Sequence, residues 1–438
     1  MFFPYIGNQK NLMTEDIVNF VWKYNSPILQ DIYLDDNKQV EVISPGEHNF
    51  DSGPDFFNAK VKIENTVWAG NVEIHLNASD WNKHGHNTNP AYDSVILHVV
   101  VKNDTTVYNS RGEIVPTVQI PYPSTLEWDL QQLVANEAWI PCANKLKGLE
   151  RFTVRMWLAS LAVERLEQKT IQVNDLVKEL KGSWEEAFYI SIARSFGLKI
   201  NALPFELLAK STPIKILAKV RSSILSIEAI LFGQAGMLET IDSSADEYIF
   251  NLKKEYDYQQ KKYSLTPIPN HLWKFMRLRP ISFPTIRIAQ FAQLIHQSSG
   301  LFSNCMEAKG FESILQLLKV GCSSYWQTHY TFGKESTLKP KIMGDDTIRI
   351  IILNTIVPFM FAYGSARGDE QLKDKALNIL ESMKPENNNV VKGFSLSGLK
   401  PENAFFSQAM VQLKSQYCDK RKCLFCQVGV SLLLKKAE

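Results

Sequence analysis

Histidines and carboxylates are concentrated in the first quarter of the chain, where their types and spacing suit one catalytic site. Five of the eight histidines fall between positions 48 and 98, interleaved with acidic residues. Imidazole and carboxylate groups are the usual ligands of catalytic divalent metals and the usual proton carriers near neutral pH. If the protein is an enzyme, we expect its chemistry in this segment. The candidates for one shared cleft are His48, Asp55, Glu73, His75, Asp80, His84, His86 and His98.

Two acids of this segment are spaced so that neighbouring strands could bring them together. Asp55 follows Gly53 and Pro54 at the start of an expected strand, and Glu73 lies in another. Glu73 and His75 are two residues apart, so in a strand their side chains leave the same face. A divalent ion between two acids would lower the pKa of a water and offset charge on a phosphodiester in the transition state. We predict Asp55, Glu73 and His75 as catalytic residues, with Mg²⁺ or Mn²⁺ bound by the acids.

The remaining histidines allow a different metal chemistry. His84 and His86 flank a glycine in an expected turn, and together with His75 or His98 they could bind zinc. A His-ligated zinc hydrolase, with His84 and His86 as metal ligands, is therefore an alternative. In the simpler interpretation both are surface residues of a loop, and His98 is a hydrogen-bonded core residue of a buried strand.

Cysteines form a second cluster, near the C-terminus. Three of the six lie within nine residues with C-x₄-C-x₂-C spacing, which is typical of zinc sites and matches the three-cysteine run of plant-type ferredoxins. Since no fourth cysteine is near in sequence, Cys142 is the first candidate for the last ligand, ahead of Cys322 and Cys305. We expect Zn²⁺ or an iron–sulfur cluster that fixes the C-terminal segment to the rest of the protein. The three clustered cysteines are Cys418, Cys423 and Cys426.

A basic and aromatic segment, residues 271–291, has the composition of a nucleic-acid contact. Cations alternate there with Trp273, Phe275 and Phe283, a pattern that suits phosphate contacts and base stacking. We therefore expect DNA or RNA as a partner; the alternative is that the aromatic residues are core and the arginines pair with acids elsewhere. The predicted nucleic-acid residues are Lys274, Arg277, Arg279 and Arg287.

Composition limits the classes of protein to which the chain can belong. Hydrophobic residues make up 45% and charged residues 21% of its 438 residues, as in soluble globular proteins. The net charge of +2 restricts any nucleic-acid surface to a local patch. No secretory signal is recognisable, and the longest apolar run, 351–364, is too short for a membrane span and predicts a buried helix. We expect a cytoplasmic protein without a membrane partner.

The elements that must position the candidate residues differ between the two parts of the chain. A helical pattern at 14–25, with Thr14 as expected N-cap, precedes the strand-like runs 39–44, 58–63, 70–76 and 94–101. From about residue 149 the apolar spacing is helical, over 151–180, 183–197, 222–233, 286–297 and 402–416. Ser183 with Glu186 predicts a capping box, and Gly197 and Gly233 predict helix ends. The pattern indicates an α+β protein: an α/β domain at 1–125, a linker at 126–148 and a mainly α-helical domain at 149–438.

The layout of the first part resembles the PD-(D/E)XK superfamily of nucleases, the restriction-endonuclease-like fold. Pro54-Asp55 and Glu73-x-His75 stand where that superfamily has Pro-Asp and Asp/Glu-x-Lys, within an α-β-β-β-α-β order. The resemblance implies a mixed β-sheet domain in which Asp55 and Glu73 bind Mg²⁺, with Glu15 as an auxiliary acid. The departure is His75 in the place of lysine, because imidazole does not supply a permanent charge.

Taken whole, the chain also resembles a bacterial protein family of unknown function, domain of unknown function 2851. The residues that carry this resemblance are 53–56, 68–86, 95–101, 232–236, 277–285 and 417–426. It implies membership and no activity. From the residues, the first hypothesis is a metal-dependent nuclease with a structural cysteine metal site. The second, from the class of binding proteins, is a non-catalytic relative that binds nucleic acid or serves as a scaffold.

Overall fold

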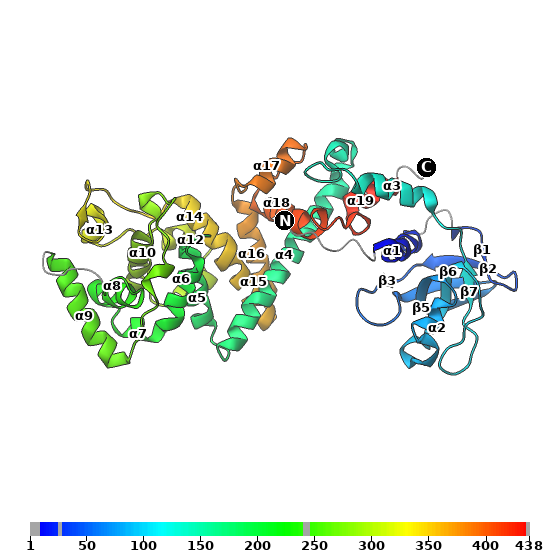
Figure 1. The fold of residues 1–438 in the computed structure, drawn as a ribbon, viewed down its shortest axis with the longest axis horizontal. Coiled ribbons are helices and arrows are strands. Elements are labelled where there is room, and N and C mark those ends of the chain that lie inside the picture. Colours follow the sequence, from blue (N-terminus) through cyan, green and yellow to red (C-terminus); the bar gives the residue numbers. More distant parts are fainter. Residues whose placement is uncertain (1–8, 25–28, 240–245, 435–438) are drawn as a thin grey trace. The chain divides into compact units, whose positions relative to one another are not determined.

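The structure is a computed structural model that describes residues 9–24, 29–239 and 246–434. The chain divides into two compact units. Unit 1 consists of residues 1–157 together with 414–438, and unit 2 of residues 158–413. Unit 1 contains a mixed β-sheet and unit 2 is mainly helical (Figure 1), so the protein has an α+β fold, as its sequence predicts.

Unit 1 is built on one seven-stranded sheet whose strands follow the order β1-β2-β4-β5-β6-β7, with β3 paired to β4. The pairs from β1 to β5 are antiparallel, whereas β6 runs parallel to β5 and β7 parallel to β6. The strands are β1 (Ile32–Tyr33), β2 (Gln39–Ser44), β3 (Glu47–His48), β4 (Phe56–Ile63), β5 (Thr66–Asn77), β6 (Val95–Lys102) and β7 (Thr117–Gln119). All four strands predicted from the sequence are present, and β5 begins four residues earlier than expected.

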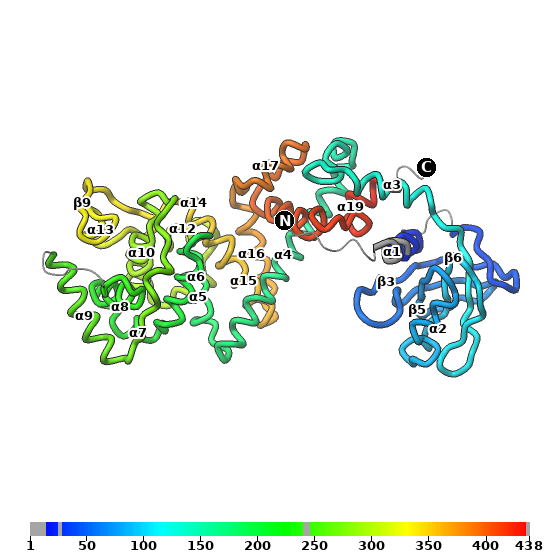
Figure 2. The backbone as a smooth tube through the Cα atoms, in the orientation of Figure 1, coloured from blue at the N-terminus to red at the C-terminus, as the bar shows by residue number. Residues whose placement is uncertain are grey.

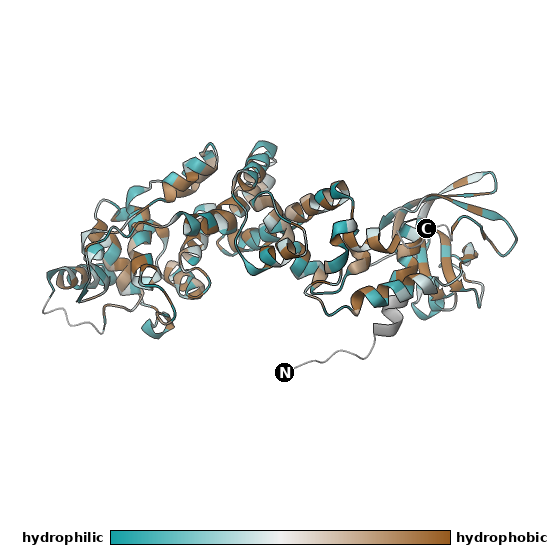
Figure 3. Ribbon diagram, turned by 90° about the horizontal axis from the view of Figure 1, so that it is seen from above, coloured by the Kyte–Doolittle hydropathy of each residue, from teal (hydrophilic) through white to brown (hydrophobic). Residues whose placement is uncertain are grey.

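Apolar and polar residues alternate along β2 and β4, so the apolar side chains of these strands lie on one face of the sheet (Figure 3). One face packs against α1 (Gln9–Lys23), through a core that includes Val18 and Trp22 of the helix. The other face is covered by the segment after β5, where Trp81 of α2 (Asp80–Lys83) is fully buried. Since β6 contributes side chains to both cores, its nearly continuous apolar run is that of a central strand. Helix α1 begins at Gln9, so the N-cap predicted at Thr14 is wrong.

The C-terminal segment is part of unit 1, which differs from the predicted domain boundaries. Leu424 and the helix α19 (Gln427–Leu434) share an apolar core with Ile17 of α1 and with α3 (Ser124–Val134). In Figure 2 the red end of the tube accordingly lies beside α3 and α1. Residues 126–148, predicted as a linker, instead form most of α3 and the 3₁₀ turn η4 (Ala143–Gly148). The boundary between the units falls within α4 (Arg151–Glu179).

Unit 2 contains the other long helices and a small two-stranded sheet. The predicted helices from residue 183 onward are all present, with end shifts of a few residues. The main helices are α5 (Trp184–Phe196), α6 (Ala202–Ser211), α7 (Ile214–Lys219), α8 (Ile224–Gln234), α9 (Glu247–Tyr263), α10 (Pro284–Gln297), α11 (Leu301–Glu307), α12 (Phe311–Leu318), α13 (Ser324–Thr328), α14 (Asp345–Ile351), α15 (Val357–Arg367), α16 (Glu370–Ser382), α17 (Asn389–Leu396) and α18 (Ala404–Gln412); the strands are β8 (His329–Thr331) and β9 (Lys334–Glu335).

The structure differs from two predictions about where helices begin and end. The hydroxyl of Ser183 accepts a hydrogen bond from the Glu186 N–H at 3.3 Å and caps α5, but the Glu186 carboxylate accepts from the Ile214 N–H instead of closing a capping box. Gly233 lies within α8 and does not end it. A Cβ there would stand 2.1 Å from the Tyr256 ring, so close packing of α9 on α8 accounts for this glycine.

One helical stretch of unit 2, Asp345–Arg367, is long and apolar enough to cross a membrane. It contains α14 and α15 joined by a π-helical turn (Ile352–Ile356), and 72% of its most apolar window is buried in the structure. The apolar residues therefore face other helices of the same unit, which confirms the buried helix predicted for 351–364.

Candidate functional site

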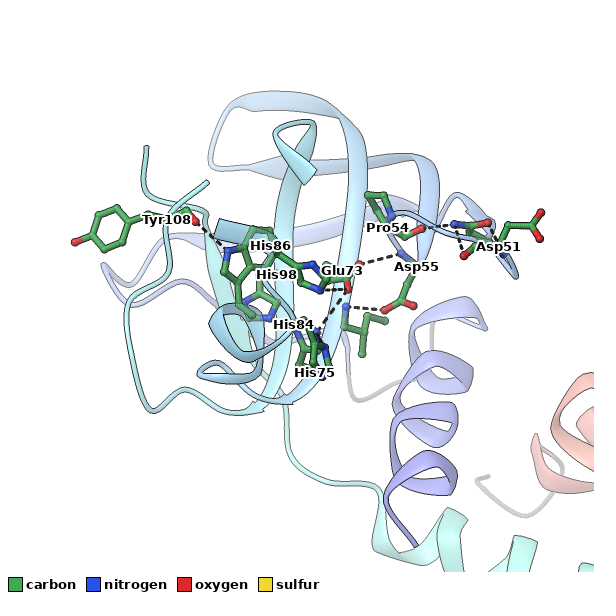
Figure 4. A network of polar contacts seen from close by, with 12 residues as sticks. Asp51, Pro54, Asp55, Glu73, His75, His84, His86, His98 and Tyr108 are labelled. Atoms are coloured by element: carbon green, nitrogen blue, oxygen red, sulfur yellow. Dashed lines mark hydrogen bonds and ion pairs between the residues drawn. The ribbon is translucent and has the colours of Figure 1, made fainter. Parts of the chain in front are cut away.

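Asp55 and Glu73 hold each other in place across two neighbouring strands (Figure 4). Asp55 immediately precedes β4, and Glu73 lies on β5 next to Val72, the register partner of Phe56. The Asp55 backbone N–H donates to Glu73 Oε2 at 3.1 Å, and Asp55 Oδ2 accepts from the Ile74 N–H at 2.9 Å. The structure thus brings together the two acids that the sequence selects, on adjacent strands and near one edge of the imidazole cluster.

The pKa values of both acids are raised, chiefly by burial. Burial, followed by the charge of Glu73, raises the pKa of Asp55 from 3.8 to about 7. Burial also raises the pKa of Glu73 from 4.5 to about 8, and Glu15 adds to this shift. The side chain of Glu15, on α1, is therefore close to the pair, and its own pKa is raised by burial. Three acids gathered at a partly buried site are an arrangement that a bound cation would stabilise.

Three imidazoles converge on the other side of Glu73. The potential ligand nitrogens of His75, His84 and His86 all lie within 4.8 Å of one another. Glu73 Oε1 lies 3.1 Å from His86 Nε2 and 3.6 Å from His75 Nε2, while His75 Nε2 is 3.1 Å from His84 Nδ1. In Figure 4 Glu73 accordingly stands between Asp55 and the imidazoles. Three imidazoles thus converge, and the Glu73 carboxylate lies beside two of them.

Among the described residues, neither ring nitrogen of His86 has a hydrogen-bond partner. The ring is nevertheless buried. His86 Nε2 lies 3.1 Å from Glu73 Oε1, but the two groups are not aligned as a hydrogen bond. Burial lowers the pKa of His86, which keeps its lone pair available. A buried imidazole without a hydrogen bond costs free energy unless another group uses its lone pair.

His98 contacts the histidine cluster through the ring of His75. It is fully buried on β6, where its Nε2 lies 2.8 Å from Nδ1 of His75 on the parallel strand β5. Burial lowers the pKa of His98 to about 3, so the imidazole is neutral and this contact is a hydrogen bond between two neutral rings. A hydrogen bond at one ring nitrogen fixes the tautomer and the orientation of the ring, as it does for metal-binding histidines whose other nitrogen is held by a neighbouring group.

Tyr92 belongs to this site although nothing in the sequence analysis selected it. Its ring stacks on His86 with centroids 3.7 Å apart, and Trp81 meets His86 edge to face. The Asn89 side chain accepts from the Ala91 N–H and turns the chain so that Tyr92 returns to the imidazole. A signal for this contact was present in the turn-forming pair Asn89-Pro90 directly after the histidines.

Two of the predicted site residues, Asp80 and His48, make other contacts within unit 1. Asp80 accepts from the backbone and side-chain N–H groups of Asn77 and is paired with Lys83, so it shapes the turn after β5. His48 packs among aromatic rings, stacked on Phe56 at 4.8 Å between centroids. Its pKa is lowered to about 4 by burial. We therefore interpret both as structural residues of unit 1.

The four predicted cysteine ligands are brought together within unit 1. Cys142 packs against the apolar core that contains Cys423, and no cysteine of the described chain is in a disulfide. Burial, then the charges of Cys426 and Cys423, raise the pKa of Cys142 to about 12. Burial and then the other three cysteines raise the pKa of Cys418 in the same way. Cys305 and Cys322 belong to unit 2 and have no part in this cluster.

The predicted nucleic-acid residues are divided by the structure. Lys274, Arg277 and Arg279 are exposed on the segment between α9 and α10. Arg287 is buried within α10, where its guanidinium donates to Gln290 Oε1 at 3.0 Å and to Thr347 Oγ1 at 3.1 Å. Its prediction as a phosphate contact is wrong, because these hydrogen bonds serve the packing of unit 2.

Comparison with known proteins shows the family and no activity. The family described as "Protein of unknown function (DUF2851)" matches residues 15–389, so the chain belongs to it. No curated protein and no solved structure has significant similarity to the chain.

Proposed function

We propose that this member of the DUF2851 family is a metal-dependent hydrolase that cleaves phosphodiesters, with a divalent transition metal bound between His75, His84, His86 and Glu73. The observation that carries the proposal is the convergence of three imidazoles within 4.8 Å, with Glu73 Oε1 within 3.6 Å of two of them. The lack of hydrogen-bond partners at the buried His86 ring supports it independently.

The nature of the donors favours zinc or manganese over magnesium. Imidazole nitrogen suits Zn²⁺ and related metals, whereas Mg²⁺ prefers oxygen ligands and water. This changes the expectation that Asp55 and Glu73 alone hold Mg²⁺. With its N–H on Glu73 Oε2 and its own Oδ2 on the Ile74 N–H, Asp55 orients Glu73 so that Oε1 faces the imidazoles. The proposal therefore combines the nuclease hypothesis with the His-ligated alternative.

The chain's own residues supply the ligands and their orientation around that ion. A bound divalent metal would provide a nucleophilic water at neutral pH and offset the charge of a phosphoryl group. Burial raises the pKa of Glu73 to about 8 in the metal-free site, and a bound cation would favour its ionised, metal-binding form. His98 holds the ring of His75, and Tyr92 and Trp81 hold the ring of His86. These contacts limit reorganisation of the site during the reaction.

The phosphodiester as substrate class is supported by the arrangement of the elements. Unit 1 has a helix, three antiparallel strands β2, β4 and β5, a short helix, and then β6 parallel to β5. Apart from the short strands β1 and β3, this α-β-β-β-α-β order is similar to that of restriction-endonuclease-like proteins, with Asp55 at the start of the second of these strands and Glu73 on the third. By this resemblance the two acids would correspond to the metal-binding acids of that superfamily.

Metal binding and cleavage can be tested together on the full chain. Metal-depleted protein is expected to bind one equivalent of Mn²⁺ by calorimetry, an ion for which the thiols of unit 1 compete only weakly, and the loaded protein to cleave labelled single- or double-stranded DNA or RNA. His84→Ala should weaken binding about tenfold or more. His271→Ala, at an exposed histidine of unit 2, is the matched control and should not. Binding without cleavage would favour a non-catalytic relative, and absence of binding would contradict the proposal.

We further propose that Lys274, Arg277 and Arg279 contribute to nucleic-acid binding, since all three are exposed within six residues. Replacing the three by glutamine is expected to weaken binding and to reduce the steepness of its salt dependence, because each lost phosphate contact releases one counterion fewer. Fluorescence anisotropy at several salt concentrations measures both. A matched triple variant of the exposed lysines Lys254, Lys261 and Lys262 on α9 removes the same charge. Equal losses in the two variants would contradict a specific contact.

A further inference from the structure

We propose that Cys142, Cys418, Cys423 and Cys426 bind one iron–sulfur cluster, at a second metal centre of unit 1 that is separate from the histidine site. The four thiols come from two segments that are about 280 residues apart in sequence and adjacent in the structure. Three of them are buried and the fourth is half-buried, and all four are free of disulfides. Four thiolates are the complete ligand set of a cluster of this kind.

Specific contacts tie the two cysteine segments together. Arg421, between Cys418 and Cys423, donates from its guanidinium to the carbonyl oxygen of Asn136 at 3.0 Å. The side chain of Asn136 in turn donates to the carbonyl oxygen of Pro141, the neighbour of Cys142, at 2.8 Å. The cysteines are thus held by a defined network, which is what a preformed metal site requires.

The local backbone provides hydrogen-bond donors to one of the sulfurs. The N–H groups of Gly429 and Val428, in the first turn of α19, donate to the Cys426 sulfur. Gly429 also lets the chain turn back closely, since a Cβ there would stand 2.0 Å from the Cys423 carbonyl oxygen. Hydrogen bonds to sulfur and low exposure to solvent are the means by which proteins stabilise and tune iron–sulfur clusters.

The spacing of the sulfurs favours a cluster over a single zinc ion. Tetrahedral zinc with bonds of about 2.3 Å would hold its four sulfurs within about 4 Å of one another. Among the described residues, only the three histidines bring three potential ligand atoms within 4.8 Å, so no three of these sulfurs do. A cluster places each thiolate on its outside and needs a wider separation. The structure therefore assigns iron and sulfide where the C-x₄-C-x₂-C spacing alone leaves zinc as an equal choice.

The test is the metal content and optical spectrum of the full chain, purified without oxygen from iron-supplemented cells. We expect iron with an equal amount of acid-labile sulfide, and a broad absorption in the visible that bleaches on reduction with dithionite. Zinc without iron would overturn the assignment of a cluster, and protein free of both metals would overturn the metal centre. These outcomes are read from the wild type, so they do not depend on the folding of any variant.

Variants then identify the ligands. Cys142→Ser and Cys418→Ser are expected to lose the visible absorption and most of the iron, whereas Cys305→Ser and Cys322→Ser, at cysteines of unit 2, should retain both. Full iron in Cys142→Ser would show that the remote cysteine is not a ligand and would overturn the four-cysteine assignment. Activity is not needed for either readout, so failure of this proposal is distinguishable from failure of the proposed hydrolase.

Discussion

Glu73→Gln is expected to lower metal-dependent hydrolysis by about 100-fold or more, because it removes the carboxylate that lies 3.1 Å from His86 Nε2. The amide oxygen of the substituted side chain could still accept from the Asp55 N–H, as Glu73 Oε2 does at 3.1 Å, so the fold should remain. Initial rates at saturating Zn²⁺ or Mn²⁺ measure the effect. Glu41→Gln on β2, an exposed acid of the same sheet, is the control, and equal rates for wild type and Glu73→Gln would exclude Glu73 from the reaction.

The same substitution should have the opposite effect on the stability of the metal-free protein. Burial raises the folded-state pKa of Glu73 to about 8, above its value of 4.5 in the unfolded chain. The stability contributed by its protonated form is therefore complete below pH 4.5 and is lost as the pH rises through about 8. Glu73→Gln cannot ionise, so its metal-free form should unfold at a higher temperature than wild type at pH 8 and show little difference at pH 5. Gain of stability together with loss of activity separates a functional acid from a structural one.

The sequence predicted the sheet well because its strands satisfy several signals at once. In β4, strict alternation along Ala59, Val61 and Ile63 requires one buried face, and the apolar run of β6 requires two. Helix starts and ends were less predictable wherever packing between helices decides them. Ser183 caps α5 through a contact three residues away, whereas Gly233 is explained by the Tyr256 ring, 23 residues further along the chain.

The composition of the site was more predictable than its geometry. Spacing two apart on one strand placed Glu73 and His75 on the same face, and their side chains do meet. Neither the hydrogen bond between His98 and His75 nor the stacking of Tyr92 on His86 follows from spacing, since each depends on how β6 and the turn after α2 return to β5. Long-range pairing of this kind is set by the whole fold and has no local signature.

Arg287 and the C-terminal segment also show that a local sequence pattern does not reveal long-range packing. The alternation of cations and aromatics around Arg287 looks like a nucleic-acid surface, yet the helical period of α10 turns this residue inward, toward Gln290 and Thr347. The apolar residues of α19 do not by themselves show which elements they pack against. The shared core with α1 and α3 assigns residues 414–438 to unit 1, and it is this assignment that brings Cys142 next to the other three cysteines.

Loss of the cysteine centre is expected to destabilise unit 1 selectively, with a fall in its melting temperature of about 10 °C or more in Cys142→Ser. The estimate corresponds to a loss of about 3–5 kcal/mol, modest for a structural metal centre in a unit of this size. Calorimetry of the full chain should show the lower transition shifted and the transition of unit 2 unchanged. Cys322→Ser, a half-buried cysteine of unit 2, is the control for loss of a thiol without loss of a centre.

The destabilisation should spread to the elements that carry the hydrolytic site, because the cysteine segment packs directly on them. Phe425, beside Cys426, lies against His48 and Phe50, with ring centroids 6.2 and 5.8 Å apart, in the segment that leads to Asp55. Leu424 packs with Ile17 and Phe20 of α1, the helix that carries Glu15 to the acids. Hydrogen exchange should therefore rise in α1 and around residues 47–55 of Cys142→Ser, while β6, which is paired with β5 and β7 and buried on both faces, stays protected. Unchanged protection in those two segments would mean that the cysteine centre holds the C-terminal segment alone and leaves the histidine site independent of it.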